Sequence, residues 1–553
     1  GQAASRNPLV RLQEKFERGF EGLRDRYHRL LGVCIRHRAV FTSCFFLACL
    51  CSFALLPFVG EDFFPKVDSG EFKLHLRAPT GTRIEETAAI CDRVDDLIRK
   101  EIPPSEIAGI IDNIGLPYSG FNLSYSTSAP IGPGDVDILV ELNKDHRPTT
   151  EYVHDLRMKL RKEFPGVASY FLPADIVTQI LNFGLPAPID IQIVGRNLAG
   201  NREFADNLLN QLKYIPGTAD LRIQQPFDQP KLHIEVDRTK AQQAGYTQRD
   251  VAQNLLISLS GSFQTAPTFW LDPKTGVSYN ITSQTPQYRV DSLQDLENIP
   301  ITGPNPAAPP EIMASLASFS RGSEMGVVSH YNVTPVIDIF GAVAGRDLGG
   351  VSRDILPIIE KAKKDLPRGS QIMVRGQILT MQSSFSGLLW GLLFSIVLVY
   401  LLIVVNFQSW LDPFVILTAL PAALAGIVWM LFVTHTTVSV PALTGAIMCM
   451  GVATANSILV VSFAKERLIE GETPSDAALN SGFTRFRPVI MTALAMIIGM
   501  LPMSLGLGEG GEQNAPLGRA VIGGLLFATV STLFFVPVFF SIVHSLRVKD
   551  SSV

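Results

Sequence analysis

The sequence has few cysteines, little net charge and no pattern typical of an enzyme site. Its 553 residues include six cysteines, with no Cys-x-x-Cys pair and no Cys/His cluster at metal-ligand spacing. The net charge of −4 gives no support for a nucleic-acid partner. No nucleophile–base constellation or phosphate-binding loop is present. We therefore expect no enzyme activity, no metal or cofactor site and no nucleic-acid partner.

Apolar residues are abundant but unevenly spread. They make up 47% of the chain against 18% charged residues, and they are concentrated towards its two ends. Six runs are each long enough to cross a bilayer: 39–59, 387–405, 413–433, 438–464, 488–507 and 520–543. None of these six runs contains Asp or Glu. The pattern predicts a polytopic α-helical membrane protein with six transmembrane helices around a large water-soluble region.

The basic residues predict the orientation. Residues 1–38 form a basic amphipathic pattern, typical of a helix on the cytoplasmic membrane surface, although a soluble helix packed on a partner is the alternative. Arg36 and Arg38 flank the first run, and further basic residues follow the fourth and the last runs. With six crossings these clusters all fall on one side. We expect both termini in the cytoplasm and residues 60–385 outside it.

The middle region alternates strand and helix patterns. A strand pattern at 72–76 precedes a helix at 84–100, where Thr82 and Glu85 have capping-box spacing. A second round begins with a strand at 189–194 and includes a strand at 232–236. The repeat predicts two ferredoxin-like α/β subdomains. Pro- and Gly-rich pieces, such as 301–310, indicate hairpin loops or a small inserted subdomain.

Several segments resemble the C-terminal half of resistance-nodulation-division (RND) efflux pumps, in order along residues 9–546. They are RAPTGTRIEET (77–87), NFQSWLDPFVILTALPAALAG (406–426), GVATANSILVVSFAKERLIEG (451–471), RFRPVIMTALAMIIGMLPMSLG (485–506) and FFVPVFF (534–540). The similar subgroup is the hydrophobe and amphiphile, or multidrug, exporters. The resemblance implies a proton-driven secondary transporter in a Gram-negative inner membrane, exporting amphiphilic compounds such as drugs and detergents.

The same resemblance implies an organisation and a set of partners. The domains are a surface helix (1–38), a first transmembrane helix (39–59), a periplasmic porter and docking region (60–385), five transmembrane helices (386–546) and a cytoplasmic tail (547–553). A matching N-terminal half with the family's membrane aspartates is missing, so a split or truncated chain is expected. A trimer, a periplasmic adaptor and an outer-membrane channel are the implied partners. Alternatives are a metal, lipid or protein exporter of the superfamily, or a non-transporting scaffold or degenerate half.

Four polar residues in the membrane region are candidates for proton coupling: Arg485, Thr492, Asn456 and Thr454. Arg485 and Thr492 match relay positions of the family and lie two turns apart on one helix. For three of them an ordinary role is the alternative: a positive-inside anchor for Arg485, helix packing for Thr492 and an interhelical hydrogen bond for Asn456. The family's lysine is replaced by Ala455.

A stripe of small residues accompanies Asn456 on its helix. The stripe consists of Ala442, Ala446, Cys449, Ala453 and Asn456. Such a stripe permits close helix approach, and the resemblance predicts that it faces the aspartate-bearing helix of the missing half.

A Gly-rich loop at 115–134 supplies the candidates for a substrate path. It contains Tyr118, Phe121 and Tyr125, which offer apolar contacts to amphiphilic drugs, and local packing of these rings is the alternative. The methionines show no clustering in this region, which argues against the copper and silver exporters of the superfamily.

Overall fold

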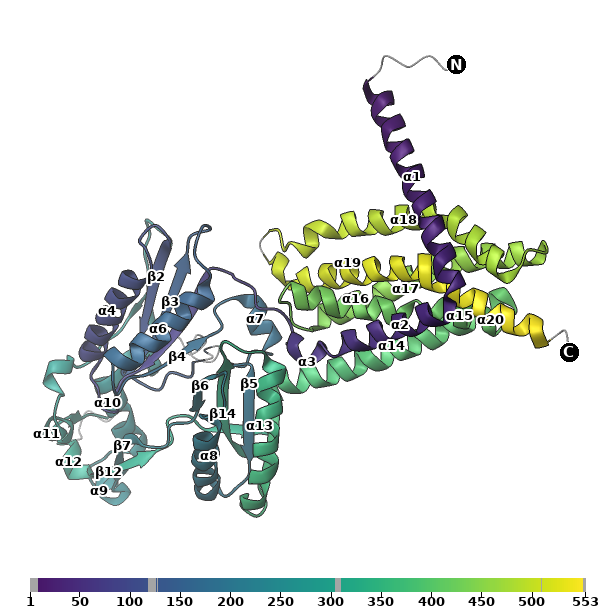
Figure 1. Ribbon diagram of the computed structural model, residues 1–553. Helices are drawn as coiled ribbons and strands as arrows, with labels where there is room; N and C mark the ends of the chain where they lie inside the picture. Colours follow the sequence, from purple (N-terminus) through teal and green to yellow (C-terminus); the bar gives the residue numbers. More distant parts are fainter. Residues whose placement is uncertain (1–7, 118–125, 127, 304–309, 509, 551–553) are drawn as a thin grey trace. The chain divides into compact units, whose positions relative to one another are not determined.

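The computed structural model describes residues 8–117, 126, 128–303, 310–508 and 510–550 (Figure 1). The chain forms two compact units. One comprises Gly1–Gln225 with Val328–Val553 and contains the apolar helices and two α/β subdomains. The other is an insertion, Pro226–Val327.

The described residues contain six helical segments that are long and apolar enough to cross a membrane, which confirms the predicted fold class. They are Arg38–Val59, Gln377–Phe407, Leu411–Val433, Val440–Ile469, Pro474–Ser504 and Ala515–Leu546. Their helices are α2 (Arg38–Phe53) with α3 (Leu56–Val59), α14 (Gln377–Phe407), α15 (Leu411–Leu417) with α16 (Leu420–Val433), α17 (Val440–Ile469), α18 (Pro474–Ser504), and α19 (Ala515–Val530) with α20 (Val536–Asp550). A π-helical turn, Ser531–Phe535, joins the last two.

The inner layer of this bundle consists of α16, α17 and α19, while α2, α14 and α18 are mostly exposed in this chain. Glycines allow the inner helices to approach closely. A Cβ atom added at Gly426 of α16 would lie 2.3 Å from the carbonyl oxygen of Gly523 on α19. A Cβ added at Gly524 would lie 2.5 Å from Sγ of Cys449 on α17. The bundle core therefore depends on small residues at these crossings.

The small-residue stripe of α17 is part of this packing. Ala442 and Ala446 are buried together with Ala520, and Cys449 and Ala453 pack with other residues of α19. The prediction that the stripe faces a helix of the missing half is therefore wrong, because the stripe contacts α19 of the same chain. A different face of α17 is exposed, with Gly451, Ala455 and Leu459 one turn apart.

The helix α1 (Pro8–Arg36) precedes the bundle and packs against α18 and α20. The ring of Tyr27 stacks on Phe486, with 4.5 Å between ring centroids, and its hydroxyl donates to the carbonyl oxygen of Leu533 at 2.6 Å. The predicted helix is present. Its position at a membrane surface stays a prediction.

The first α/β subdomain has the order β1-α4-β2-β3-α6-β4. Its elements are β1 (Glu71–Arg77), α4 (Ile84–Glu101), β2 (Ile107–Ile114), β3 (Asp135–Leu142), α6 (Thr149–Glu163) and β4 (Ala168–Leu172). The sheet order β2-β3-β1-β4, with antiparallel pairs, is that of a ferredoxin-like fold. The capping box predicted at Thr82 and Glu85 is absent. The N-cap of α4 is Arg83, and the Thr82 hydroxyl donates to the carbonyl oxygen of Pro79.

The second subdomain repeats this plan. Its elements are β5 (Ile189–Val194), α8 (Leu198–Leu212), β6 (Thr218–Ile223), β14 (Thr334–Val343), α13 (Leu348–Ala362) and β15 (Gln371–Gly376), with β13 (Ser329–Tyr331) paired to β14. β14 and β15 flank β5, and β6 pairs with β14, so the order again matches a ferredoxin-like sheet. A bidentate ion pair links the two subdomains, from Arg157 of α6 to Asp220 of β6 at 2.9 and 2.7 Å.

The inserted unit is built on the antiparallel pair β7 (Gln229–Val236) and β12 (Ala317–Glu324). The strand predicted at 232–236 therefore belongs to the insertion and not to the second sheet. Its helices include α9 (Arg238–Gln243), α10 (Gln248–Ser260), α11 (Leu293–Glu297) and α12 (Met313–Leu316). A hairpin, β8 (Thr268–Leu271) with β9 (Ser278–Ile281), exposes the side chains of Trp270 and Tyr279.

Candidate functional site

Two of the predicted membrane residues contact each other. Asn456 of α17 is buried, and its Oδ1 accepts a hydrogen bond of 2.9 Å from the Thr492 hydroxyl of α18. Thr492 is itself exposed in this chain, like Ala455 next to Asn456. The pair thus lies at the edge of the face that α17 and α18 leave uncovered.

Thr454 does not join this pair. Its hydroxyl donates to the carbonyl oxygen of Met450 in the same helix, at 2.8 Å. A hydrogen bond of 3.0 Å between Ser457 and Thr532 connects α17 to the π-helical turn before α20. A second interhelical bond near this level therefore comes from Ser457, which was not among the residues selected from the sequence.

Arg485, on α18, does not contact the Asn456–Thr492 pair. Its guanidinium carbon is 4.9 Å from the ring centroid of Phe463, and its Nε is buried with no hydrogen-bond partner among the described residues. No ion pair involving Arg485 is found in this part of the chain. Its neighbour Phe486 packs on Tyr27 of α1. A cation with this little compensation is a candidate for pairing with a charge from another segment.

A buried ionic cluster lies at the end of α17 and was missed by sequence reasoning. Asp412 stands just before the predicted run 413–433, but in the structure it lies in the first turn of α15 and is 1% exposed. Its two oxygens contact Nζ of Lys465 at 3.0 Å and Nε2 of His544 at 3.1 Å. Lys465 also donates to the carbonyl oxygen of Phe407. The cluster ties α15, α17 and α20 together.

A polar cavity of about 750 Å³ lies at the opposite end of α17. Arg519 of α19 donates to the carbonyl oxygen of Ser504 and to the hydroxyl of Thr436 at 2.9 and 2.6 Å, and lines this cavity. Asp62 and Lys66 line it from the segment that follows α3. Burial raises the pKa of Asp62 and lowers the pKa of Lys66, so both groups are held closer to neutrality than in water.

The first sheet buries a fully paired charge network. The ring of His75 is completely buried, with Nδ1 at 2.7 Å from Asp137 and Nε2 at 3.1 Å from Asp135. Lys73 contacts Asp137 at 3.0 Å and Arg77 contacts Asp135 at 2.7 Å. Although burial opposes it, hydrogen bonds from His75 and the charge of Arg77 hold the pKa of Asp135 below its usual range. The pKa of Asp137 is lowered in the same way by His75 and Lys73.

The second sheet buries carboxylates with fewer partners. Asp190 of β5 is completely buried and Asp338 of β14 nearly so, and each has one carboxylate oxygen without a hydrogen-bond partner in the described residues. Gln192 donates to Asp190 at 3.0 Å and Gln225 to Asp338 at 2.6 Å. Burial and the charge of Asp338 raise the pKa of Asp190 to about 8. Burial also raises the pKa of Asp338.

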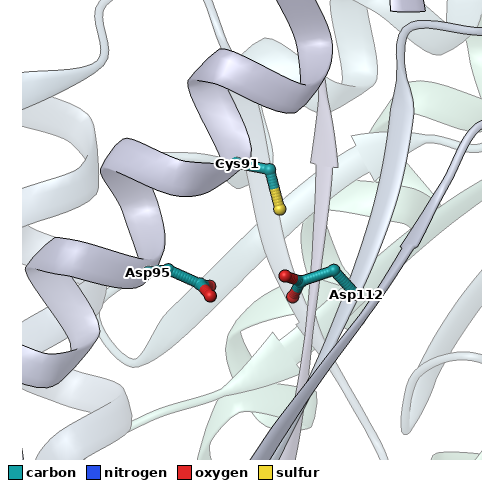
Figure 2. A group of neighbouring side chains, drawn as sticks. All are labelled: Cys91, Asp95 and Asp112. Carbon is teal, nitrogen blue, oxygen red and sulfur yellow. The ribbon is translucent and has the colours of Figure 1, made fainter. Parts of the chain in front are cut away.

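One group of side chains among the described residues could share a metal ion: Cys91, Asp95 and Asp112. Cys91 and Asp95 are one turn apart on α4, and Asp112 lies on the neighbouring strand β2 (Figure 2). One ligand atom from each lies within 4.8 Å of the others. The sequence analysis predicted no metal site. The spacing of four residues between Cys91 and Asp95, which places both on one face of a helix, could have indicated it.

The predicted substrate-path residues Tyr118, Phe121 and Tyr125 all lie outside the described residues. Their assignment stays a prediction.

Known proteins resemble this chain along almost its whole length. The nickel-cobalt-cadmium resistance protein NccA of Alcaligenes xylosoxydans xylosoxydans is 26% identical, with 95% of this chain and 48% of that protein covered. The multidrug/solvent efflux pump membrane transporter MepB of Pseudomonas putida is 25% identical over 96% of this chain and 49% of that protein. The chain thus spans about half the length of the curated relatives that it matches.

The fold has solved counterparts as well. The crystal structure of a heavy metal efflux pump superposes with a TM-score of 0.78 at 22% identity, over 95% of this chain and 52% of that one. The family model described as AcrB/AcrD/AcrF family matches residues 2–544. With six apolar helices, two ferredoxin-like subdomains and a small insertion, the chain belongs to this family of RND transporters.

Proposed function

We propose that this chain is one half of a proton-driven RND efflux pump in a Gram-negative inner membrane. In this proposal residues 60–385 are periplasmic and both termini are cytoplasmic, with 1–38 as a surface helix and 547–553 as a tail. The observation that carries the proposal is the uncovered face of α17 and α18. It exposes Ala455 and Thr492 beside the buried Asn456, where a bundle in lipid would place a further helix.

The charge of Arg485 supports a carboxylate-bearing partner. A guanidinium stays ionised at all working pH values, and a buried nitrogen without an acceptor is costly in an apolar environment. An aspartate on a matching N-terminal half would supply that acceptor. Protonation of the aspartate would weaken its attraction to Arg485, which gives the helices two arrangements with different contacts. Thr492, two turns further along α18, and its partner Asn456 would then be polar groups on the same uncovered face, with Thr454 bonded within α17.

The exposed aromatic residues of the β8–β9 hairpin support the predicted trimer. Trp270 and Tyr279 are about half exposed on opposite strands of a short two-stranded ribbon. Large apolar side chains at such a tip are typical of a surface that binds another protein. A second protomer is the proposed occupant, with a periplasmic adaptor and an outer-membrane channel completing the pump.

For the substrate we favour divalent transition-metal cations over amphiphilic compounds. NccA and a cobalt-zinc-cadmium resistance protein, CzcA of Cupriavidus metallidurans, are as similar to the chain as the multidrug transporter MepB. The Cys91–Asp95–Asp112 group offers a thiol and carboxylates, which are ligands for such cations.

Resistance assays test this function. The chain is expressed with a matching N-terminal half in a strain that lacks its own exporters, and growth is measured in Co²⁺, Zn²⁺ or Cd²⁺ and, separately, in a bile salt. Growth in the metals alone is expected. Resistance to the bile salt alone would support the amphiphile alternative, and resistance to neither would contradict the transport proposal.

The Arg485 role is tested in the same strain. Arg485→Ala is expected to reduce resistance to that of cells without the pump, at unchanged membrane level on a blot. Arg487→Ala is the matched control, because Arg487 is two residues away on the same helix and exposed. Full resistance with Arg485→Ala would exclude the coupling role and favour a simple membrane anchor.

A further inference from the structure

The arrangement of Cys91, Asp95 and Asp112 departs from the pattern of the surrounding fold. On α4 the side chains that face the sheet are mostly apolar, among them Ile90, Val94 and Ile98. Cys91 and Asp95 are buried on the same side, at 1% and 5% exposure. An aspartate in this layer is costly unless something positive compensates it.

Asp112 faces Asp95 from the strand. Along β2, Ile110 and Ile114 pack against the core cluster, and Asp112 lies between them in the alternation of the strand. Its side chain therefore points to the α4 side of the sheet, while the preceding residue, Ile111, is 65% exposed on the other face. Figure 2 shows the carboxylates of Asp95 and Asp112 pointing towards one another, with the thiol of Cys91 directed into the same space.

Among the described residues, one basic side chain, that of Arg99, pairs with these carboxylates. Arg99 binds Oδ2 of Asp95 at 3.2 Å, whereas Oδ1 of Asp95 is buried and has no hydrogen-bond partner in the described residues. That oxygen faces the Asp112 carboxylate, and two carboxylate oxygens repel unless a proton or a cation lies between them.

We propose that Cys91, Asp95 and Asp112 form a binding site for a borderline divalent transition-metal cation such as Zn²⁺, Co²⁺ or Cd²⁺. One sulfur and two carboxylate oxygens are a ligand set that such ions accept. With the thiol deprotonated and Arg99 in place, the four side chains carry a net charge of −2, which matches the charge of the ion.

The site would be open on one side. Three protein ligands leave one tetrahedral position for water, which is typical of sites that exchange their ion. Asp112 is exposed, so the ion can enter from solvent along β2. Binding requires loss of the Cys91 proton, which passes to solvent as the thiolate–metal bond forms. This site would place the cation of the proposed function on this chain. Only the step from a bound ion to a transported ion rests on the proposed function.

Titration with Co²⁺ tests the site on the purified full chain in detergent. Thiolate ligation gives an absorption band that carboxylates alone do not produce. The wild type is expected to show the band at one equivalent, and Cys91→Ser to lose it. Asp112→Asn should weaken binding at least about tenfold, because loss of even an outer-shell partner has an effect of this size. Since Asp112 is exposed, this variant retains the core of the subdomain.

Two matched controls separate the site from its surroundings. Asp96→Asn removes an exposed carboxylate of α4, and Cys51→Ser removes an exposed thiol of α2. Both should bind Co²⁺ like the wild type. Bound Zn²⁺ should also slow alkylation of Cys91, measured on its peptide by mass spectrometry.

The Co²⁺ titration and the resistance assays test the metal site and the proposed function separately. Absence of the band in the wild type, or its persistence in Cys91→Ser, would overturn the site whatever the resistance assays show. Binding by the purified chain together with an assembled pump that gives no metal resistance would leave the site intact and contradict metal export.

Discussion

The two ferredoxin-like subdomains share a strand order but differ in how many partners their buried charged groups have. In the first sheet, His75 lies between Asp135 and Asp137, with Lys73 and Arg77 contacting the same carboxylates. Each ring nitrogen of His75 lies against one of the two carboxylates, and Lys73 and Arg77 add one cation to each of them. Neither carboxylate is left without a partner.

The second sheet places Asp190 and Asp338 on adjacent strands, where side-chain amides and not basic side chains donate to them. One oxygen of each carboxylate and Oε1 of Gln192 have no hydrogen-bond partner among the described residues. Nε of Arg375, on the neighbouring strand β15, likewise lacks a partner there. The same fold therefore contains one charge network that stabilises it at neutral pH and one that opposes folding at neutral pH. Polar groups held at such a cost are frequently functional.

The largest effect is expected from His75→Leu. The substitution removes the imidazole from between the buried Asp135 and the partly exposed Asp137, and removing one partner from a buried charge network costs about 3–5 kcal/mol. Hydrogen exchange of β1 and β3 amides in the purified full chain, followed by mass spectrometry, measures the loss, while β5 and β14 report on the second sheet. His154→Leu is the control, because His154 is exposed on α6 of the same subdomain. A loss below about 1 kcal/mol would mean that the first network is not the stabilising one.

The secondary structure of both subdomains could be predicted because each strand and helix carries its own period. The strand predicted at 189–194 coincides with β5, and the apolar faces of the helices are visible in the chain. Pairing could not be predicted in the same way. The strand at 232–236 has a strand pattern, but only β12, far along the sequence, determines that it belongs to the insertion.

For the candidate sites, too, contacts between distant parts of the chain could not be predicted. A small-residue stripe predicts close approach to some helix, but not that the helix is α19 of the same chain. Asp412 and His544 are 132 positions apart, so their contact cannot be inferred from either neighbourhood. Asn456 and Thr492, by contrast, were selected individually from the family resemblance, and the structure places them in contact. Cys91 and Asp95 were within reach of sequence reasoning, since a spacing of four places both on one helix face.

A smaller effect, of opposite sign, is expected from Asp190→Asn. The folded pKa of Asp190 is raised to about 8, so the folded state retains a proton that the unfolded chain releases at neutral pH. This group's contribution to stability is therefore lost as pH rises and regained as pH falls. At pH 7 the asparagine should stabilise the second sheet by about 1–3 kcal/mol, since each pKa unit corresponds to about 1.4 kcal/mol.

The pH dependence sharpens the contrast between the sheets. In the wild type, β5 and β14 should gain protection between pH 7 and pH 5, after correction for intrinsic exchange, and Asp190→Asn should remove most of this gain. Asp135 and Asp137 have lowered pKa values, so their contribution to the first sheet is lost only as pH falls below about 4. Asp206→Asn, at an exposed position of α8, is the control. A destabilised Asp190→Asn would show that the second network is also stabilising.

The smallest effect is expected from Lys73→Met. Lys73 contacts Asp137 at 3.0 Å, but its side chain is 17% exposed, and Asp137 keeps its contacts with His75 and Ser128. Partly exposed ion pairs contribute about 0.2–1 kcal/mol, so the protection of the β1 and β3 amides should fall only slightly. The fall should be similar to that caused by the control Lys162→Met, which replaces an exposed lysine of α6. Added salt should reduce the difference further, since it screens exposed pairs more than buried ones. If Lys73→Met reduced protection as much as His75→Leu does, the main stabilising charge would lie at the rim of the sheet and not at the buried imidazole. The two sheets would then differ in the solvent exposure of their charged groups and not in how those groups are paired.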